Sequence, residues 1–332
     1  MAGPVDHDTI AAQRTLLLTG ATGFVGRAVR PALAATGWRV RCLTRDASRA
    51  RQQVPDLEWV QGDVSDVAAS ARALAGCQAA LYLVHSIGAD TDYLGQEVRA
   101  AENFAGAAAA EGVARIVYLG GVAPRGAGSE HLRSRLAVGA ALRASPVPTV
   151  ELRASMIVGH GSLSWLIVRD LAARLPVMVL PRWLKSRTEP VAIDDVVVAL
   201  ARALDMPLAA SASFDVPGPD VLSGKRILEE TARVLGLPRP RTLEVPLLTP
   251  RLSSLWIRFV TRADWQIARE VVLGLGEDLL ARDAAFWKLI GHAPRLAFAE
   301  AARRALAAEA QPIGGPWGVI ERARRPAGGP GS

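Results

Sequence analysis

The chain has 332 residues, half of them apolar, with 39 basic and 32 acidic side chains and a formal net charge of +7. This composition excludes a wholly disordered chain, and the length allows one large domain or two modest ones. The basic residues are spread out. Because no basic stripe with interleaved aromatic residues is present, the sequence does not predict nucleic-acid binding.

The cysteines and the N-terminus bear on the compartment. Cys42 and Cys77 belong to no metal-binding spacing, and the first residues lack the apolar region of a signal peptide. We therefore expect reduced thiols and a cytoplasmic protein. The most apolar stretch, 162–181, is interrupted by three charged residues and predicts no integral membrane span. Peripheral membrane contact and the oligomeric state stay open.

Strands and helices are predicted to alternate from residue 14 to about residue 160. The predicted strands are 15–19, 38–43, 57–60, 79–84, 115–120 and 148–157. The predicted helices are 24–36, 66–75, 94–112 and 131–144. Because a parallel crossover needs a connection long enough for a helix, the alternation predicts an α/β fold with a doubly wound parallel sheet.

The remainder of the chain has a looser pattern and predicts a smaller, mostly helical region. We expect a flexible arm over 1–13, a first domain over 14–160, a second region over 161–310 and a disordered tail over 311–332. Part of the second region, about 189–204, is expected to pack back on the first domain. Helices rich in tryptophan are predicted at 253–261 and 263–281. The tryptophans of this region suggest either core packing or a bulky apolar ligand: Trp165, Trp183, Trp256, Trp265 and Trp287.

The strongest motif is Gly20-Ala-Thr-Gly23-Phe-Val-Gly26, which joins the first strand to the first helix. Gly20 permits a tight turn, Gly23 lets the backbone approach a pyrophosphate, and Gly26 lets the helix pack against the strand. A phosphate then rests on the free N–H groups at the start of that helix. The motif predicts a Rossmann-type dinucleotide site.

The end of the second strand bears on the choice between NAD and NADP. An acidic residue there holds the ribose hydroxyls of NAD, whereas an arginine accommodates the 2′-phosphate of NADP. Arg45 therefore favours NADP(H) over NAD(H), with Arg27 and Arg41 as further candidates. The neighbouring Asp46 keeps NAD(H) open.

A second motif makes the resemblance specific. Gly62-Asp63-Val64 follows the third strand, and with the glycine loop it resembles the short-chain dehydrogenase/reductase superfamily. The stretches "LYLVHSIGADTDYLGQEVRAAEN" and "HLRSRLAVGAALRASPVPTVELRASMIVGHGSLSW" are similar to its atypical NmrA-like and YbjT-like members, over residues 14 to about 310. In that family the aspartate holds the adenine amino group and the next residue lines the adenine. On its own, Asp63 could equally be a turn residue or a helix cap. The resemblance implies cofactor contacts for Gly20, Thr22, Gly23, Phe24, Val25, Gly26, Asp63, Val64, Val84 and His85.

The catalytic positions depart from the family pattern. Usual members carry a Tyr-x-x-x-Lys pair on the helix after the fifth strand, and a Ser or Thr at the end of that strand. Here Gly120 and Gly121 stand at the hydroxyl position, and His131 and Arg135 stand at the spacing of the pair. Arg135 is expected to contact the cofactor ribose and to lower the pKa of His131. His131 is the candidate acid or base, and the alternative is an ordinary helix start capped by Ser129.

Four other positions are candidates near the same edge of the sheet. Tyr93, beyond the fourth strand, is the alternative proton donor. His160 and Ser162 are expected on the substrate side, and Arg153 on the sixth strand is a candidate for a buried ion pair. No histidine or cysteine spacing predicts a metal site.

Two functions are compatible with the resemblance. One is an NADP-dependent oxidoreductase acting on a small molecule that is bulky and apolar. The other is a catalytically silent NADP-binding redox sensor of the NmrA type, which the missing Tyr, Lys and Ser favour. The long C-terminal half favours the oxidoreductase, since sensing alone needs less of a pocket.

Overall fold

The computed structural model describes seven segments, 14–85, 93–126, 128–174, 177–181, 185–238, 241–245 and 277–309, with only the backbone of 177–181 and 241–245. The predicted arm over 1–13, the tail over 311–332, the helix at 253–261 and Trp183, Trp256 and Trp265 lie outside the described residues.

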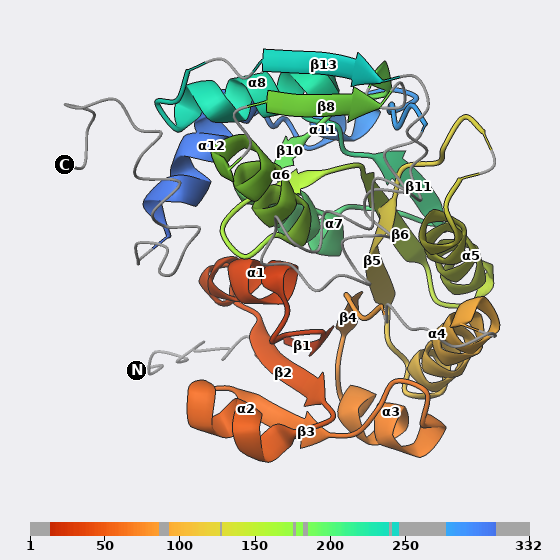
Figure 1. The fold of residues 1–332 in the computed structure, drawn as a ribbon. Coiled ribbons are helices and arrows are strands. Elements are labelled where there is room, and N and C mark those ends of the chain that lie inside the picture. Colours follow the sequence, from red (N-terminus) through yellow and green to blue (C-terminus); the bar gives the residue numbers. More distant parts are fainter. Residues whose placement is uncertain are drawn as a thin grey trace, which may run out of the picture.

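A central sheet of seven parallel strands organises the molecule, in the order β11-β6-β5-β4-β1-β2-β3 (Figure 1). The strands are β1 (Thr15–Thr19), β2 (Arg39–Thr44), β3 (Glu58–Gln61), β4 (Ala79–Tyr82), β5 (Arg115–Gly121), β6 (Thr149–Ala154) and β11 (Ala212–Asp215). The predicted α/β fold is confirmed. The strand order reverses between β1 and β4, and open α/β sheets bind ligands outside the carboxyl ends of the strands at such a point.

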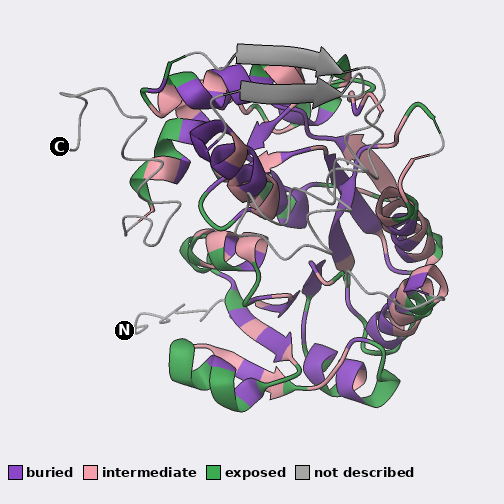
Figure 2. Cartoon of the chain, viewed as in Figure 1, coloured by how far each residue is buried: buried purple, intermediate pink, exposed green. Residues whose placement is uncertain are grey.

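Helices cover both faces of the sheet. They are α1 (Phe24–Ala35), α2 (Ala47–Gln53), α3 (Val67–Leu74), α4 (Tyr93–Ala110), α5 (Glu130–Ala144) and α7 (Ile193–Asp205). In β1, Leu16 and Leu18 join the core beneath α1, α2 and α7, whereas Leu17 joins the core beneath α3, α4 and α5. Figure 2 shows the buried residues along the strands and on the inner sides of these helices. The central strands β1 and β4 therefore read as nearly continuous apolar runs, because both of their faces are covered.

The helix α2 was not predicted from the sequence. Its residues, Ala-Ser-Arg-Ala-Arg-Gln-Gln, bury only Ala47 and Ala50 and have no apolar stripe. The helix begins because the Asp46 carboxylate accepts a hydrogen bond from the Arg49 N–H. A short helix that depends on its cap gives no signal of helical periodicity.

The C-terminal half adds three two-stranded sheets to its helices. These elements are β7 (Ile157–Val158), α6 (Leu163–Arg174), β8 (Val177–Pro181), β9 (Arg187–Thr188), β10 (Val191–Ala192), β12 (Leu222–Ser223), α8 (Gly224–Val234), β13 (Arg241–Val245), α11 (Ala285–Leu289) and α12 (Phe298–Ala307). The core between α6, α8 and α12 holds Trp165 against Phe298, while Trp287 packs in the core beside α7. These two tryptophans are thus core residues. In the same half, α7 packs against α1 and β11 completes the central sheet.

The predicted helix over 263–281 is wrong for its last five residues. Glu277–Ala281 has no helical structure, and Leu279 forms a bridge with Thr188. The carboxylates of Glu277 and Asp278 accept hydrogen bonds from backbone N–H groups of distant loops. Such tertiary bonds compensate for the helical bonds that the segment lacks.

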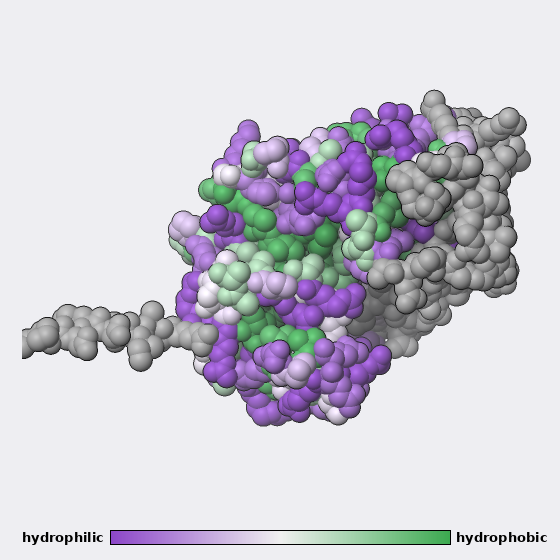
Figure 3. All heavy atoms as spheres, turned by 90° about the vertical axis from the view of Figure 1, so that its left-hand side faces the viewer, coloured by the Kyte–Doolittle hydropathy of each residue, from purple (hydrophilic) through white to green (hydrophobic). Residues whose placement is uncertain are grey.

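The face on the left-hand side of Figure 1 carries α1, α2 and α12. Figure 3 shows that its apolar groups gather in separate areas with hydrophilic residues between them. Within the described part of the chain, every helix is too short or too polar to cross a membrane.

Candidate functional site

The glycine loop closes tightly between β1 and α1. Gly20 has a φ of +67°, and a Cβ there would lie 2.9 Å from the Leu83 carbonyl oxygen, just past β4. A Cβ on Gly26 would lie 2.3 Å from the Gly20 oxygen, so the helix meets the loop at a distance that only glycine allows. Both glycines are required by the packing of the protein itself.

Gly23 has a different environment. A Cβ there would have, among the described residues, only the Gly20 carbonyl oxygen within 4 Å, at 3.2 Å. Gly23 is exposed and caps α1 without a side-chain bond, so the first N–H groups of the helix have no side-chain cap. The adjoining Thr22, Phe24 and Val25 are exposed or half-buried. The loop thus leaves space and backbone donors for a pyrophosphate.

The end of β2 distinguishes the candidate arginines. Arg41 bonds Glu58 at 2.6 Å and two backbone carbonyls, and Arg27 bonds the Thr22 carbonyl at 2.8 Å. Arg45 is exposed, and no ion pair ties it to the described residues. One carboxylate oxygen of Asp46 caps α2 by accepting a hydrogen bond from the Arg49 N–H. The arginine at this strand end is therefore free for a phosphate while the acid is partly engaged.

Asp63 and Val64 lie past β3, on the same edge. The Asp63 Oδ1 accepts hydrogen bonds from the Ser65 N–H at 2.9 Å and the Ser65 hydroxyl at 2.7 Å. Partial burial opposes its charge, yet the two bonds from Ser65 and the Arg45 cation outweigh this and lower the pKa of Asp63. Asp63 is thus an ionised acceptor whose Oδ2 makes no bond to the described residues, and Val64 is buried beside it.

His131 and Arg135 contact each other on the first turns of α5. The Arg135 Nε donates to the His131 Nε2 at 2.9 Å. Burial, and then the Arg135 charge, lower the pKa of His131 from 6.5 to about 3. The ring is therefore neutral at physiological pH, and its proton is on Nδ1 because Nε2 accepts from the guanidinium. That buried Nδ1 donor has no protein acceptor within the described residues.

His85 and Val84 bring the end of β4 to the same place. The rings of His85 and His131 meet edge to face, with their centroids 6.3 Å apart. The Arg135 charge, and then burial of the ring, lower the pKa of His85 well below its ordinary value. Leu83, which abuts the glycine loop, is two residues away. The structure thus brings the glycine loop, His85 and the His131–Arg135 couple to one edge of the sheet.

The missing hydroxyl at the end of β5 has a steric reason. A Cβ on Gly121 would lie 3.4 Å from the Arg135 Cδ and 3.2 Å from a Leu132 methyl. A Cβ on Gly120 would lie 3.1 Å from the buried Glu151 carboxylate. The Leu132 methyl at Gly121, and the Tyr118 ring and the Glu151 carboxylate at Gly120, therefore leave little room for a serine side chain.

Tyr93 has its hydroxyl engaged within the helix layer. It hydrogen-bonds Glu97, whose carboxylate also accepts from the Ser134 hydroxyl at 2.6 Å. Burial and the Glu97 charge raise the pKa of Tyr93. Tyr118, in β5, is buried and donates to the Arg135 carbonyl at 3.1 Å. The two tyrosines connect α4 and β5 to the helix that carries His131.

Arg153 and Ser162 have structural roles. Arg153 and Arg143 share the fully buried Glu151, at 2.9 and 2.7 Å, as the ion-pair hypothesis expected. Ser162 is buried, bonds the Ile157 carbonyl at 2.6 Å and caps α6 through the Trp165 N–H. His160, next to it, is exposed. No group of histidine, cysteine or carboxylate side chains in the described segments is arranged to hold a metal ion.

Comparison with known proteins gives the family. The model of an NAD(P)H-binding domain matches residues 20–172. The ceramide reductase of Caulobacter vibrioides is 30% identical over 243 residues, which cover 71% of this chain and 74% of the relative. The chain belongs to the atypical, NmrA-like short-chain dehydrogenases/reductases that bind NAD(P). A second member, the (4-alkanoyl-5-oxo-2,5-dihydrofuran-3-yl)methyl phosphate reductase of Streptomyces griseus, is 32% identical over 233 residues, covering 67% and 74%.

Solved structures of this superfamily agree with the fold. The Citrobacter triphenylmethane reductase complexed with NADP(H) matches with a TM-score of 0.67 at 18% identity, covering 88% of this chain and 99% of the other. The Bordetella bronchiseptica enzyme WbmH in complex with NAD⁺ matches with a TM-score of 0.64 at 18% identity, covering 89% and 97%. The domain match and the 30% identical relative confirm the NmrA-like assignment and a reductase-like, NAD(P)-binding family, and the solved structures show the fold.

Proposed function

We propose that this protein is an NADPH-dependent reductase of a bulky, apolar carbonyl compound. The observation that carries the proposal is the unpaired Nδ1 donor of a neutral His131 at the edge of the sheet where the glycine loop lies. Leaving such a donor unpaired costs about 1–3 kcal/mol, so a ligand oxygen or a water is expected there. Both relatives named above are reductases, which supports the direction of the reaction.

The preference for NADPH rests on Arg45. Its guanidinium is exposed at the end of β2, whereas Asp46 is used by the cap of α2. We assign the pyrophosphate to the glycine loop, the adenine to Asp63 and Val64, and the inner edge of the cofactor to Val84 and His85. Arg135 keeps guanidinium N–H groups beyond its Nε for the nicotinamide ribose.

The role proposed for His131 toward the substrate carbonyl follows from its protonation state. Bound NADPH supplies a hydride to the substrate carbon. The His131 Nδ1–H then hydrogen-bonds the carbonyl oxygen as negative charge develops on it, and Arg135 holds the ring in that tautomer. Because the pKa of His131 is about 3, the ring stays neutral and orients the oxygen, and a water delivers the proton. Tyr93 is the second candidate donor, but its hydroxyl is hydrogen-bonded to Glu97.

The substrate region is assigned to 161–310, with residues 14–160 holding the cofactor and 189–204 packed on that domain. A relative named for ceramide supports an apolar substrate. A cytoplasmic location is part of the proposal, and it rests on two free, buried cysteines.

The test is a titration of NADPH and NADH into the purified protein, followed by the loss of NADPH absorbance with a panel of carbonyl compounds. The panel includes ceramides and an alkanoyl-dihydrofuranone methyl phosphate, for which the relatives are named. Turnover of an apolar member with NADPH supports the reductase. Tight NADPH binding without turnover by any member overturns it.

A redox sensor is the second candidate, and one observation favours it. With glycine at the end of β5 and a histidine whose pKa is about 3, neither position supplies an acid at neutral pH. A sensor binds NADPH and NADP⁺ with different conformations, which limited proteolysis detects.

A further inference from the structure

We propose that Glu277 is a positioning residue, whose carboxylate fixes the loop between β5 and α5 and thereby the place of His131 and Arg135. The inference rests on the proposed function, since it concerns the residues assigned to the reacting end of that site. It adds a residue from the C-terminal half that no sequence motif marks.

The carboxylate of Glu277 is bound by backbone donors of this loop. The Gly126 N–H donates to Oε2 at 3.0 Å, and the Gly128 N–H lies 3.2 Å from Oε1 and 3.3 Å from Oε2. Converging backbone N–H groups make a concave site for an anion. Here that anion is a side chain about 150 residues away in the sequence.

Gly126 leaves room for the carboxylate. A Cβ at this position would lie 2.7 Å from Oε2 and 2.8 Å from Oε1 of Glu277. The φ of Gly126 is outside the left-handed region, so an alanine there is compatible with the backbone but not with the seated carboxylate. The contact can therefore be broken by a substitution at Gly126 or at Glu277.

The hydrogen bonds to Glu277 also fix the start of α5, because the loop leads directly into this helix. Gly128 directly precedes Ser129, whose hydroxyl caps α5 by accepting from the Leu132 N–H. His131 lies two residues beyond the cap, and Arg135 lies one turn later on the same face. A shift of the residues before the cap thus moves the first turn, where the pair sits.

Glu277 is itself held firmly by its neighbours. Asp278 accepts from the Arg187 N–H and from its guanidinium, both at 2.7 Å, and these side-chain and backbone bonds lower the pKa of Asp278. The Leu279 N–H donates to the Arg187 carbonyl at 2.8 Å, and the Arg282 N–H donates to Asp215 at 2.7 Å. The segment therefore provides a fixed anchor for the loop.

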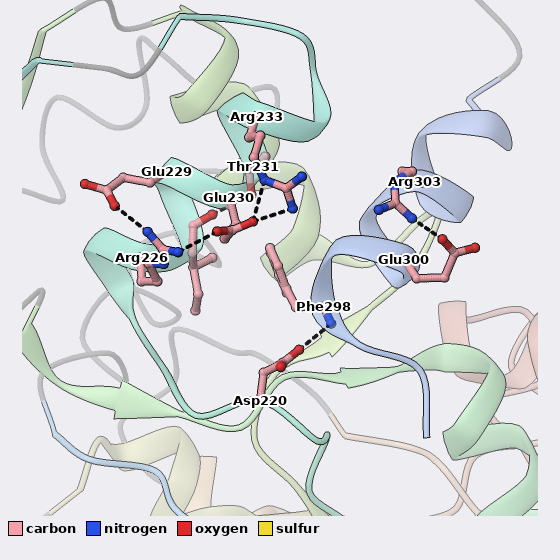
Figure 4. Close-up of polar contacts among 10 residues, drawn as sticks. Asp220, Arg226, Glu229, Glu230, Thr231, Arg233, Phe298, Glu300 and Arg303 are labelled. Atoms are coloured by element: carbon pink, nitrogen blue, oxygen red, sulfur yellow. Dashed lines mark hydrogen bonds and ion pairs between the residues drawn. The ribbon is translucent and has the colours of Figure 1, made fainter. Parts of the chain in front are cut away.

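Other carboxylates of the C-terminal half differ in their partners and serve as controls. Figure 4 shows Glu300 on α12 turned toward Arg303 of the same helix. Among the described residues, the Glu300 carboxylate bonds only Arg303 and Arg304, and the Glu300 side chain is 40% exposed. Such a surface pair contributes little to stability and holds no loop. Glu300→Ala thus removes the same group without touching α5.

The experiment uses the full chain and needs no substrate. The ring signals of the five histidines are followed by NMR from about pH 5 to pH 8, with His131→Phe assigning one of them. In the wild type and in Glu300→Ala, His131 should not titrate. In Glu277→Ala it should titrate within this range, because the first turn of α5, which carries His131, moves away from the Arg135 side chain. Trypsin should cleave after the exposed Arg125 about tenfold faster in Glu277→Ala, and at the wild-type rate in Glu300→Ala.

Gly126→Ala should act in the same direction, and the double variant should go no further than the stronger single variant. Where Glu277→Ala fails to fold, Gly126→Ala decides the matter, and Glu277→Gln, which keeps one acceptor oxygen, should show a smaller change. The proposal is overturned if, in the alanine variants that fold, His131 does not titrate between pH 5 and pH 8 and cleavage after Arg125 keeps its wild-type rate. Absence of turnover, with these two readouts changed as expected, rejects the reductase and leaves the role of Glu277 intact.

Discussion

The glycine loop and the start of α5 lie on one edge of the same sheet but are built differently. The loop is made by seven consecutive residues, and the glycines at its two ends are required by contacts with the loop itself and with Leu83. The start of α5 depends on residues from several parts of the chain: His85, Tyr118 and Glu277. A local motif predicts the first region, whereas the second exists only in the folded chain.

The largest expected effect is on cofactor affinity, and it distinguishes the glycine that leaves space for a ligand from the glycine that is needed for packing. Gly23→Val should lower the affinity for NADPH by at least about a hundredfold, because the side chain enters the space assigned to the pyrophosphate. Its unfolding temperature should fall less than that of Gly26→Ala, since Gly23 has a negative φ and a Cβ there would lie 3.2 Å from the Gly20 oxygen. Calorimetric titration and thermal unfolding measure the two effects.

Gly26→Ala is the matched control for that prediction. Its Cβ would lie 2.3 Å from the Gly20 oxygen, so this variant should lose stability first. Unchanged NADPH affinity in Gly23→Val would contradict the assignment of the loop.

The next largest effect is on the choice between NADPH and NADH, at the adenosine end of the cofactor. An Arg–phosphate bond is charge-assisted and contributes about 1.5–3 kcal/mol. Arg45→Ala should therefore weaken NADPH about ten- to a hundredfold and leave NADH nearly unchanged, as measured by parallel titrations. Arg41→Ala serves as the contrast, because Arg41 bonds Glu58 and should affect stability. Equal losses for both cofactors in Arg45→Ala would place the 2′-phosphate elsewhere.

At the other end of the site, His131→Phe should spare NADPH binding within about twofold and reduce turnover about tenfold or more, the cost of losing one donor to a developing oxyanion. Since the pKa of His131 is about 3, the wild-type rate should show no step near pH 6.5 from this residue. A pH–rate profile that falls through pH 6.5 in the wild type, and is flat in His131→Phe, would mean that the ring is an acid after all.

Sequence and structure agree where the physical cause is local. Strand β1 was predicted to the residue, and α1 and α5 to within one residue at each end. The lowering of the His131 pKa by Arg135 followed from their spacing of four residues. The sequence could not show α2, whose start depends on the Asp46 cap, or the non-helical course of Glu277–Ala281, whose partners lie far along the chain. Nor does the sequence show how little room surrounds Gly121, because the Leu132 methyl that a Cβ there would meet is placed by the packing of α5 on β5.

The smallest expected effect is on stability. The folded state keeps the pKa of His131 below its unfolded value, so the unfolded chain binds more protons between about pH 3 and pH 6.5. The stabilisation is complete above pH 6.5 and is lost as the pH falls through this range. Urea unfolding at pH 7 and pH 5 should therefore show a smaller loss of stability in His131→Phe than in the wild type, with His160→Phe, which removes an exposed ring, as control. Equal losses in all three proteins would mean that His131 is not held neutral.

The central claim is that one edge of the sheet holds NADPH with its nicotinamide beside His131 and Arg135. A crystal structure of the protein with NADPH tests it most directly. The account predicts the pyrophosphate against Gly23, the 2′-phosphate on Arg45, the ribose near the Arg135 guanidinium and the nicotinamide ring next to His131. A bound nicotinamide that lies away from α5, with His131 turned to solvent, would contradict the account.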